Sequence, residues 1–496
     1  MNQIKLNIIS SIILQFVTMI YGFVIPRIVI FTFGSEVNGL VSSLNQFLNY
    51  ATLIEGGLGG VVIASLYKPL SNKNIDEISS IVKSSSSFFK KVALVILAYS
   101  VALAFIYPII VKSSFSYEYT FFLCIILMAN LFIQYYCSLT WRMLLYADGK
   151  VYVINTIQSV VMILNLLFAF VIINIYPQIH LFKILGIFVF LIQPIVYSLY
   201  VKKHYPYINK NSNLNTNIEN KRWDGLGQTI SYFIHNNTDI VIITFLLSLK
   251  DVSVYSINMM IVGSVSGLVS SITSSVVPSL GKKIASDNVV EANEAFGLYE
   301  FGVLFFSIPL FAACAVLIIP FLRIYTSGIS DTNYLVLSFS LLMVIAKLLH
   351  SIRNVYIQVA YSSGKFKETS VFAYFEAIIN IFFSLLLVIK IGINGIAIGT
   401  ILAIIFRIAA HIYYNKKNIV FRSIFYEIKF LLVYLLCFVF LVFVGFEFTD
   451  TRCLNYFEWF KLSLMYVLFS FITIFGVSYV FYKKYLMTIL SKLYIT

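Results

Sequence analysis

Charged residues are scarce in this chain, and their scarcity excludes a water-soluble globular protein. Asp, Glu, Lys and Arg make up 11% of the 496 residues, whereas hydrophobic residues make up 60%. Apolar runs of about 20 residues recur along the whole sequence, and each is long enough to cross a bilayer. Because lipid cannot satisfy backbone polar groups, these runs predict a bundle of membrane-spanning helices.

Cysteine is also scarce, and the residue patterns typical of enzymes and metal sites are missing. The chain has five cysteines, without the paired spacing of a disulfide framework or a metal site. It has no glycine–lysine loop for phosphate, no metal-ligand spacing and no Ser–His–Asp arrangement. The predicted outer loops are too short for a catalytic domain. We therefore expect a protein that is not an enzyme and that binds neither a metal nor a cofactor.

Acidic residues are fewer than basic ones, and the distribution of the basic residues predicts an orientation. The 35 Lys and Arg residues exceed the 21 Asp and Glu residues, which gives a formal net charge of +14. The basic residues do not form one patch, which argues against a nucleic-acid partner. They gather in alternate loops, so the positive-inside rule predicts that both termini lie in the cytoplasm.

Fourteen hydrophobic spans are predicted, as two halves of six spans and a final pair. The stretch from Ile28 to Phe33 resembles that from Ile240 to Phe245, and Gly149-Lys150 recurs at nearly the same offset as Gly364-Lys365. Two even-numbered halves share one orientation, as in transporters built from parallel repeats. The predicted spans are 8–33, 37–66, 88–111, 117–146, 151–174, 181–201, 225–249, 252–277, 297–322, 334–361, 369–389, 393–414, 429–447 and 459–482.

An Asn-rich stretch between the sixth and seventh spans is typical of a flexible linker. We therefore expect an N-terminal six-helix lobe (1–203), a cytoplasmic linker (204–224) and a C-terminal six-helix lobe (225–417). The final segment (418–496) would hold two further spans and a cytoplasmic tail.

The second predicted span carries polar residues along one face. Asn38, Ser42, Asn45, Asn49 and Thr52 follow one another at steps of three or four residues, which keeps them on one side of a helix. Such residues either form hydrogen bonds between helices or line an aqueous cavity. The length of the stripe favours the cavity.

The tenth predicted span repeats this pattern with a charge added. Lys347, Ser351, Asn354 and Gln358 share one face, and Arg353 lies beside them. Lys347 is about 20 Å from the cytoplasmic end of the span, and ionisable groups at such depth usually face a cavity or a partner. We expect Lys347 and Arg353 to face a central cavity between the lobes.

Basic side chains outnumber acidic ones inside the spans. The four basic residues are Arg27, Lys347, Arg353 and Arg407, although Arg353 and Arg407 could instead extend towards the membrane surface. Asp239 is either a proton or cation site or the counter-charge of Arg27. Glu376 forms either a second acidic site or, as we favour, a structural hydrogen bond. The candidates for coupling or gating are Asp239, His235, Glu55 and Glu376.

The two six-helix halves, the polar second span and the sequence TDIVII at Thr238–Ile243 resemble the polysaccharide transporters. This family belongs to the multidrug/oligosaccharidyl-lipid/polysaccharide exporter superfamily. More narrowly, the chain looks like a bacterial O-antigen or capsule oligosaccharide flippase, over residues 1 to about 425. The resemblance implies a MATE-like fold in the bacterial cytoplasmic membrane. It also implies alternating access that moves undecaprenyl-pyrophosphate-linked oligosaccharide to the outer leaflet, with a proton or sodium ion and a polysaccharide polymerase as candidate partners.

A lipid pyrophosphate that carries sugars needs a cationic cavity with hydrogen-bonding groups. The spans contain four basic residues and three acidic ones, and this excess of positive charge favours an anionic substrate. Arg27, Lys347, Arg353 and Arg407 are therefore the candidate substrate-binding cations. Two alternatives stay open: a flippase for lipid II or a teichoic-acid precursor, since lipid II flippases also have fourteen spans, and a MATE-like exporter of small molecules.

Overall fold

Twelve helices are long and apolar enough to cross a membrane in the part of the chain that the structure describes. A thirteenth span is counted when the bent pair Ser35–Glu55 and Leu58–Ser71 is taken as one. The remaining predicted span, 225–249, lies partly outside the described residues, which show there the short apolar helix Asn237–Leu246. The predicted all-α, multi-pass membrane fold is confirmed.

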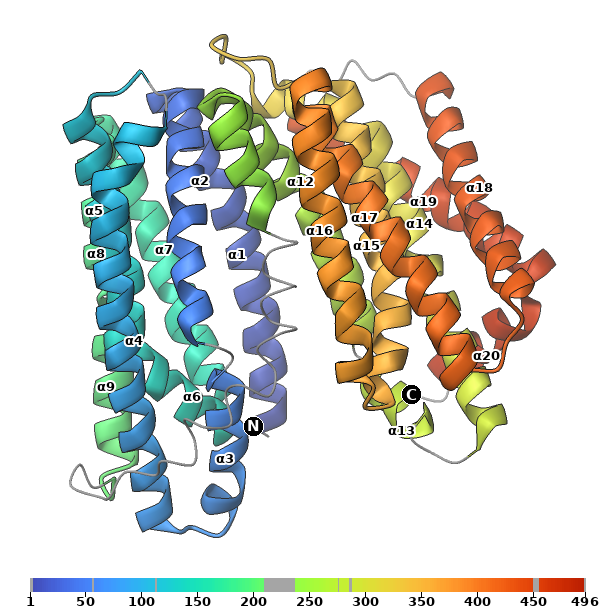
Figure 1. The fold of residues 1–496 in the computed structure, drawn as a ribbon, viewed down its shortest axis with the longest axis horizontal. Helices are drawn as coiled ribbons and strands as arrows, with labels where there is room; N and C mark the ends of the chain where they lie inside the picture. The colour runs from blue at the N-terminus through green and yellow to red at the C-terminus, as the bar shows by residue number, and fades with distance from the viewer. Residues whose placement is uncertain are drawn as a thin grey trace. The chain divides into compact units, whose positions relative to one another are not determined.

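The computed structural model divides the chain into two units (Figure 1). Unit 1 comprises Met1–Ser253 and unit 2 comprises Val254–Thr496. The structure describes residues 3–55, 58–111, 114–208, 237–274, 276–284, 288–448 and 455–494.

Unit 1 is a helical bundle in which α1 packs along α7 and α4 packs along α5. Its hydrophobic core gathers around large buried side chains such as Phe89, Leu144 and Tyr197. Gly34 turns the chain from α1 into α2 with φ 89°, a backbone conformation that favours glycine. The described helices are α1 (Gln3–Phe33), α2 (Ser35–Tyr50), η1 (Ala51–Glu55), α3 (Leu58–Ser71), α4 (Ile75–Ile110), α5 (Tyr117–Ile133), η2 (Gln134–Ser138), α6 (Leu139–Ala147), α7 (Val151–Ile175), α8 (Ile179–Phe190) and α9 (Ile192–His204).

Three of the predicted spans of unit 1 are interrupted. The second span leaves regular α-helix after Tyr50, continues as the 3₁₀ turn η1 and resumes as α3 with a bend of 45°. The fourth contains the π-helical segment η2 between α5 and α6. The sixth is divided at Leu191 into α8 and α9. Such irregular turns re-aim the side chains that follow them.

Residues 237–253 pack on α2 and belong to unit 1. The Ser43 and Thr244 hydroxyls lie 2.7 Å apart, and Gln46 donates to the Asn237 side chain at 2.6 Å. Asn38 donates to Ser253 at 2.8 Å. These buried hydrogen bonds join α2 to residues 237–253, and Asn38 belongs both to them and to the predicted polar stripe.

Unit 2 is built around α14, the most buried of its membrane helices. Helices α15, α18 and α19 all pack against it, and Trp459 of α19 donates its indole N–H to the Leu317 carbonyl at 3.1 Å. The two extra spans predicted at the end of the chain are thus part of this unit. Its described helices are α12 (Leu249–Ser274, which begins in unit 1), α13 (Val277–Ile284), α14 (Val289–Tyr325), α15 (Leu337–Ser362), α16 (Phe366–Ile391), α17 (Ile393–Asn418), α18 (Ile424–Phe448), α19 (Tyr456–Phe481) and α20 (Lys483–Tyr494).

The close approach of Leu249 to α2 yields a stability prediction. A Cβ added at Gly39 would lie 1.7 Å from the Leu249 carbonyl oxygen, so Gly39→Ala requires a backbone shift. We expect it to lower the free energy of unfolding by about 1–3 kcal/mol, measured by thermal unfolding in detergent. Gly22→Ala in α1 is the matched control, because its Cβ would meet no atom within 4 Å. Equal stability of the two variants would contradict the packing of Leu249 on α2.

Candidate functional site

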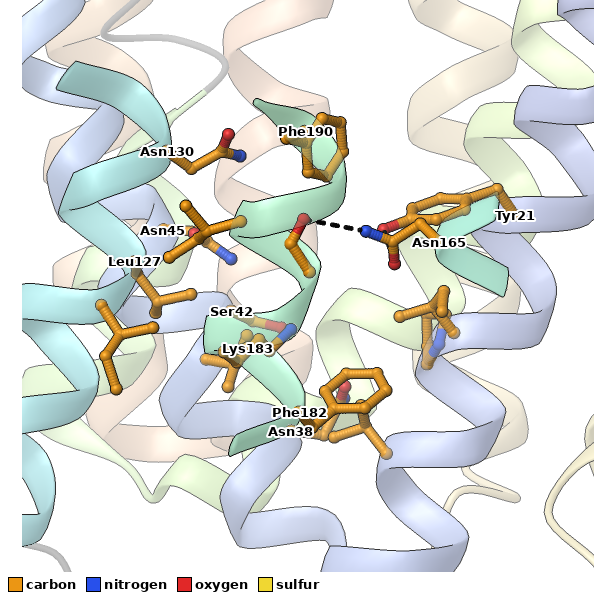
Figure 2. Close-up of a pocket in the computed structure, with 17 residues that line it drawn as sticks. Tyr21, Asn38, Ser42, Asn45, Leu127, Asn130, Asn165, Phe182, Lys183 and Phe190 are labelled. Carbon is orange, nitrogen blue, oxygen red and sulfur yellow. Dashed lines mark hydrogen bonds between the residues drawn. The ribbon is translucent and has the colours of Figure 1, made fainter. Parts of the chain in front are cut away.

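Unit 1 contains a cavity of about 410 Å³ between α1, α2, α5, α7 and α8 (Figure 2). This volume is within the range of small-molecule pockets, roughly 300–1,000 Å³. Its described lining includes one basic residue and no acidic residue. The polar lining residues are Tyr21, Asn38, Ser42, Asn45, Asn130, Asn165 and Lys183, and the aromatic ones besides Tyr21 are Phe182 and Phe190.

The helical period of α2 brings the first part of the predicted stripe to this cavity. Asn38, Ser42 and Asn45 lie at positions i, i+4 and i+7, and all three line the cavity. Asn49 is exposed and does not line it, whereas Thr52 in η1 donates to the Asn49 carbonyl at 2.7 Å. The stripe thus divides at the end of α2 into cavity-lining residues and residues beyond the cavity.

Asn165 joins three helices at the cavity wall. Its Nδ2 donates to the Gly186 carbonyl of α8 at 3.3 Å, and its Oδ1 accepts from the Tyr21 hydroxyl of α1 at 3.5 Å. Figure 2 shows Asn165 and Tyr21 together on one side of the cavity. Because both ends of its amide are bonded, Asn165 holds the wall in place.

Four other polar groups of the lining are not engaged in this way. Among the described residues, Ser42, Asn45 and Asn130 have no side-chain hydrogen-bond partner, and Lys183 has no carboxylate partner. The Lys183 ammonium lies 5.4 Å from the centre of the Phe182 ring, a cation–π distance. These groups are available to a ligand that enters the cavity.

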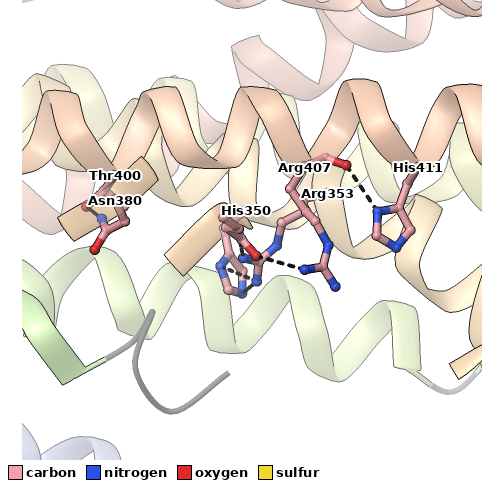
Figure 3. A network of polar contacts seen from close by, with 7 residues as sticks. His350, Arg353, Asn380, Thr400, Arg407 and His411 are labelled. Atoms are coloured by element: carbon pink, nitrogen blue, oxygen red, sulfur yellow. Dashed lines mark hydrogen bonds and ion pairs between the residues drawn. The ribbon is translucent and has the colours of Figure 1, made fainter. Parts of the chain in front are cut away.

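Unit 2 contains a buried ion cluster formed by three helices (Figure 3). The Glu376 carboxylate of α16 accepts from Arg353 of α15 through Oε1, and its Oε2 lies 3.4 Å from Arg407 Nη1 of α17. The three side chains belong to residues that are 3–4% exposed. Arg353 also donates to His350 at 3.0 Å, and His411 lies 3.1 Å from the Arg407 carbonyl. One carboxylate therefore contacts two buried guanidinium groups, so two positive charges and one negative charge leave the cluster with a formal net charge of +1.

The cluster combines residues that the sequence analysis treated separately. Arg353 and Arg407 were expected as cavity cations, and the structure places both on Glu376 inside unit 2. Asn380, one turn from Glu376, donates instead to Thr400 at 2.9 Å. Breaking a buried pair is strongly destabilising, so this arrangement supports a structural role for the three charges.

The remaining predicted residues of unit 2 lie along α15. The Ser351 hydroxyl donates to the Lys347 carbonyl at 3.2 Å. Lys347, Asn354 and Gln358 are partly buried. None of these four residues lines the cavity described above.

The remaining predicted residues of unit 1 lie outside the cavity lining. Arg27 follows the lining residue Pro26, and its guanidinium lies 5.4 Å from the Phe31 ring. Glu55 accepts from the Tyr135 hydroxyl of η2 at 2.8 Å and from the Gly59 N–H at 3.2 Å. Asp239 is 7% exposed. His235 falls outside the described residues.

Sequence reasoning missed Lys183, Asn130 and Asn165 as cavity residues. Lys183 stands near the start of the predicted span 181–201, where extension to the membrane surface explains a lysine. Asn130 lies in the predicted span 117–146, in which no site residue was predicted. The available signal was that two asparagines and one lysine occur within predicted membrane spans.

Comparison with known protein families finds no match, and no curated protein sequence matches the chain. Solved structures do resemble it. A lipid II flippase, MurJ, in an inward-closed conformation aligns with TM-score 0.73 and 17% identity over 96% of this chain and 99% of its own. An inward-facing MATE-family multidrug resistance transporter aligns with TM-score 0.61 and 16% identity, over 83% and 99% of the two chains.

A third neighbour is a transporter of the MOP superfamily from Pyrococcus furiosus whose binding pocket is described as having reverse polarity. It aligns with TM-score 0.52 and 15% identity over 83% of this chain and 95% of its own. Identities at this level establish the fold alone. The chain therefore has the MATE-like fold that the sequence predicted, shared with a lipid II flippase and with multidrug transporters.

The ion cluster yields the second prediction. Glu376→Gln removes the carboxylate that faces Arg353 and Arg407, and we expect it to lower the free energy of unfolding by about 3–5 kcal/mol. The matched control is Glu368→Gln on the same helix, where the pair with Lys365 is 43–47% exposed. Exposed pairs contribute less than about 1 kcal/mol. Thermal unfolding that shifts equally in both variants would show that the cluster is not a stabilising unit.

Proposed function

We propose that the protein is a flippase that moves a lipid-linked, hydroxyl-rich and anionic glycan precursor to the outer leaflet of the bacterial cytoplasmic membrane. The narrower form of this proposal has undecaprenyl-pyrophosphate-linked oligosaccharide as the substrate, for the assembly of a surface polysaccharide. Transport by alternating access requires two conformations whose populations the substrate shifts.

The cavity of unit 1 is the observation that carries the proposal. Its free amide and hydroxyl groups suit a substrate rich in hydroxyl groups, since amides both donate and accept hydrogen bonds. Lys183, without an acidic residue in the described lining, favours a negative ligand and disfavours an organic cation. A MATE-like exporter of cationic small molecules is therefore the weaker alternative.

A flippase for lipid II is the second candidate. The lipid II flippase structure aligns with 96% of this chain, whereas the multidrug and Pyrococcus furiosus transporters align with 83%. Lipid II and a lipid-linked oligosaccharide both join sugars to a polyprenyl pyrophosphate, so the fold supports either substrate. The two substrates differ in their sugars, so recognition of the glycan would distinguish the two candidate functions.

Arg27 and Lys347 are the cations we assign to the pyrophosphate. Arg353 and Arg407 are also candidates from the sequence, but both form ion pairs with Glu376 in this structure. They could bind the substrate only if these ion pairs were broken. Asp239 and Glu55 remain our candidates for coupling to a proton or sodium ion. Glu55 lies at the bend that follows α2 and accepts a hydrogen bond from Tyr135 of η2, so it joins two irregular segments.

A reconstituted transport assay tests the function. The purified protein in proteoliposomes is supplied with undecaprenyl-pyrophosphate-linked oligosaccharide, lipid II or ethidium, and movement across the bilayer is measured for each. We expect the lipid-linked oligosaccharide to reach the opposite leaflet, where a membrane-impermeant lectin detects it. Movement of ethidium alone would refute a flippase, and movement of lipid II alone would establish the second candidate.

The two assigned cations yield the third prediction. Arg27→Ala and Lys347→Ala are each expected to lower the rate of flipping at least tenfold, because each removes a charge that faces the pyrophosphate. Membrane abundance should stay near that of the wild type. Lys365→Ala, which removes an exposed lysine of unit 2, is the control and should keep the wild-type rate. Wild-type flipping by both Arg27→Ala and Lys347→Ala would refute their assignment.

A further inference from the structure

We propose that the cavity of unit 1 binds a single acidic sugar of the transported glycan, with Lys183 as the partner of the sugar carboxylate. The chemical class is a uronic acid, a pyranose ring that carries one carboxylate. This inference rests on the proposed function and adds the identity of the group that the cavity recognises.

The described lining of the cavity carries one positive charge, which suits a ligand with one negative charge. Lys183 is the single basic residue among the described lining residues, and no carboxylate accompanies it. A sugar carboxylate carries one negative charge, whereas a pyrophosphate that joins a lipid to a sugar carries two. A charge removed from water without a partner is costly. The cavity therefore fits the carboxylate, and a pyrophosphate there would keep one charge uncompensated.

The neutral groups of the cavity match the hydroxyl groups of a sugar. Ser42 and Asn45 on α2 and Asn130 on α5 have no side-chain hydrogen-bond partner among the described residues. Each can both donate and accept, as can a sugar hydroxyl. A site built to bond hydroxyl groups rejects molecules that lack them, because its own polar groups would then be buried without partners.

Aromatic rings supply the apolar part of the site. Phe182 and Phe190 lie on α8, and both rings border the cavity in Figure 2. The Phe182 ring also packs against Phe33 of α1, with centroids 6.2 Å apart, which restricts its orientation. The C–H groups of a pyranose ring pack on such surfaces, while the hydroxyl groups reach the amides.

The size of the cavity limits what it holds. At about 410 Å³ it is near the lower end of the range for small-molecule pockets. One sugar unit fits this space, and a complete lipid-linked oligosaccharide does not. The cavity would thus bind one sugar unit of the glycan.

Binding of monosaccharides to the full-length protein in lipid nanodiscs tests the proposal. Glucuronic acid, glucose and inorganic pyrophosphate are titrated separately, with affinities measured by saturation-transfer NMR. Because a hydrogen bond to a charged group contributes about 1.5–3 kcal/mol, we expect glucuronic acid to bind roughly tenfold to a hundredfold more tightly than glucose. Pyrophosphate should bind no more tightly than glucose at this site.

Variants assign the preference to Lys183. Lys183→Met should reduce the affinity for glucuronic acid to that for glucose, and Lys183→Arg should keep the preference. Asn45→Ala should weaken both sugars by a similar factor. Lys90→Met is the matched control: the Lys90 ammonium also lies 5.4 Å from an aromatic ring, that of Tyr136, and Lys90 does not line the cavity. This control should bind both sugars as the wild type does.

Equal affinity of the wild type for the two sugars would overturn the inference. So would the absence of glucuronic acid binding, a preference that survives in Lys183→Met, or tighter Lys183-dependent binding of pyrophosphate. The transport assay separates this inference from the proposed function. Flipping of lipid-linked oligosaccharide without any sugar preference would refute only the acidic sugar, whereas a Lys183-dependent preference without flipping would refute only transport.

Discussion

A polar side chain inside a bilayer must either bond to another part of the protein or face water, because lipid offers it nothing. This constraint separates two kinds of polar residue in the structure. Glu376 forms ion pairs with Arg353 and Arg407, and Asn380 donates to Thr400. These residues use their polarity to join helices. Four polar groups of unit 1 that have no such partner among the described residues line one cavity instead, where a ligand can reach them.

The same constraint explains how the last two membrane helices are fixed. Arg422, just before α18, lies 3.0 Å from Glu300 of α14 and 3.1 Å from Glu427 of α18. Tyr356 of α15 donates to Glu300 at 2.6 Å. The hydroxyl of Tyr434 on α18 lies 3.0 Å from that of Ser478 on α19. Such a set of partnered buried groups specifies where helices sit, so α18 and α19 belong to the architecture of unit 2 rather than to a loosely attached anchor.

The sequence predicted the fold because the relevant signals are local. Span length is a property of one continuous stretch, and lipid leaves few alternatives to a helix. The cavity-lining face of α2 was predictable for the same reason, since Asn38, Ser42 and Asn45 repeat at the helical period. The end of α2 at Tyr50 was not, because the apolar sequence continues through the bend.

Contacts between helices could not be predicted from one sequence. Arg353, Glu376 and Arg407 stand on three helices, and nothing in their spacing indicates that they meet. Each was therefore interpreted alone, two as cavity cations and one as a hydrogen-bonding acid. Lys183 shows the converse problem. Its position near the end of a span has an ordinary explanation, and only the fold reveals that α8 carries it to the wall shared with α2 and α5.

The excess of basic residues within the spans consequently has two physical meanings. At 3% exposure, Arg353 and Arg407 are held by the fold against Glu376, whose carboxylate offsets one of their two positive charges. Lys183 is one charge without a carboxylate neighbour in a cavity of neutral groups, and in such surroundings a single charge acts with less screening than in water. The number of basic residues in the spans is therefore a poor guide to the charge of the substrate. What decides it is the small subset that the helices leave unpaired, and a change at one such position can alter the class of ligand while the packing of the helices stays the same.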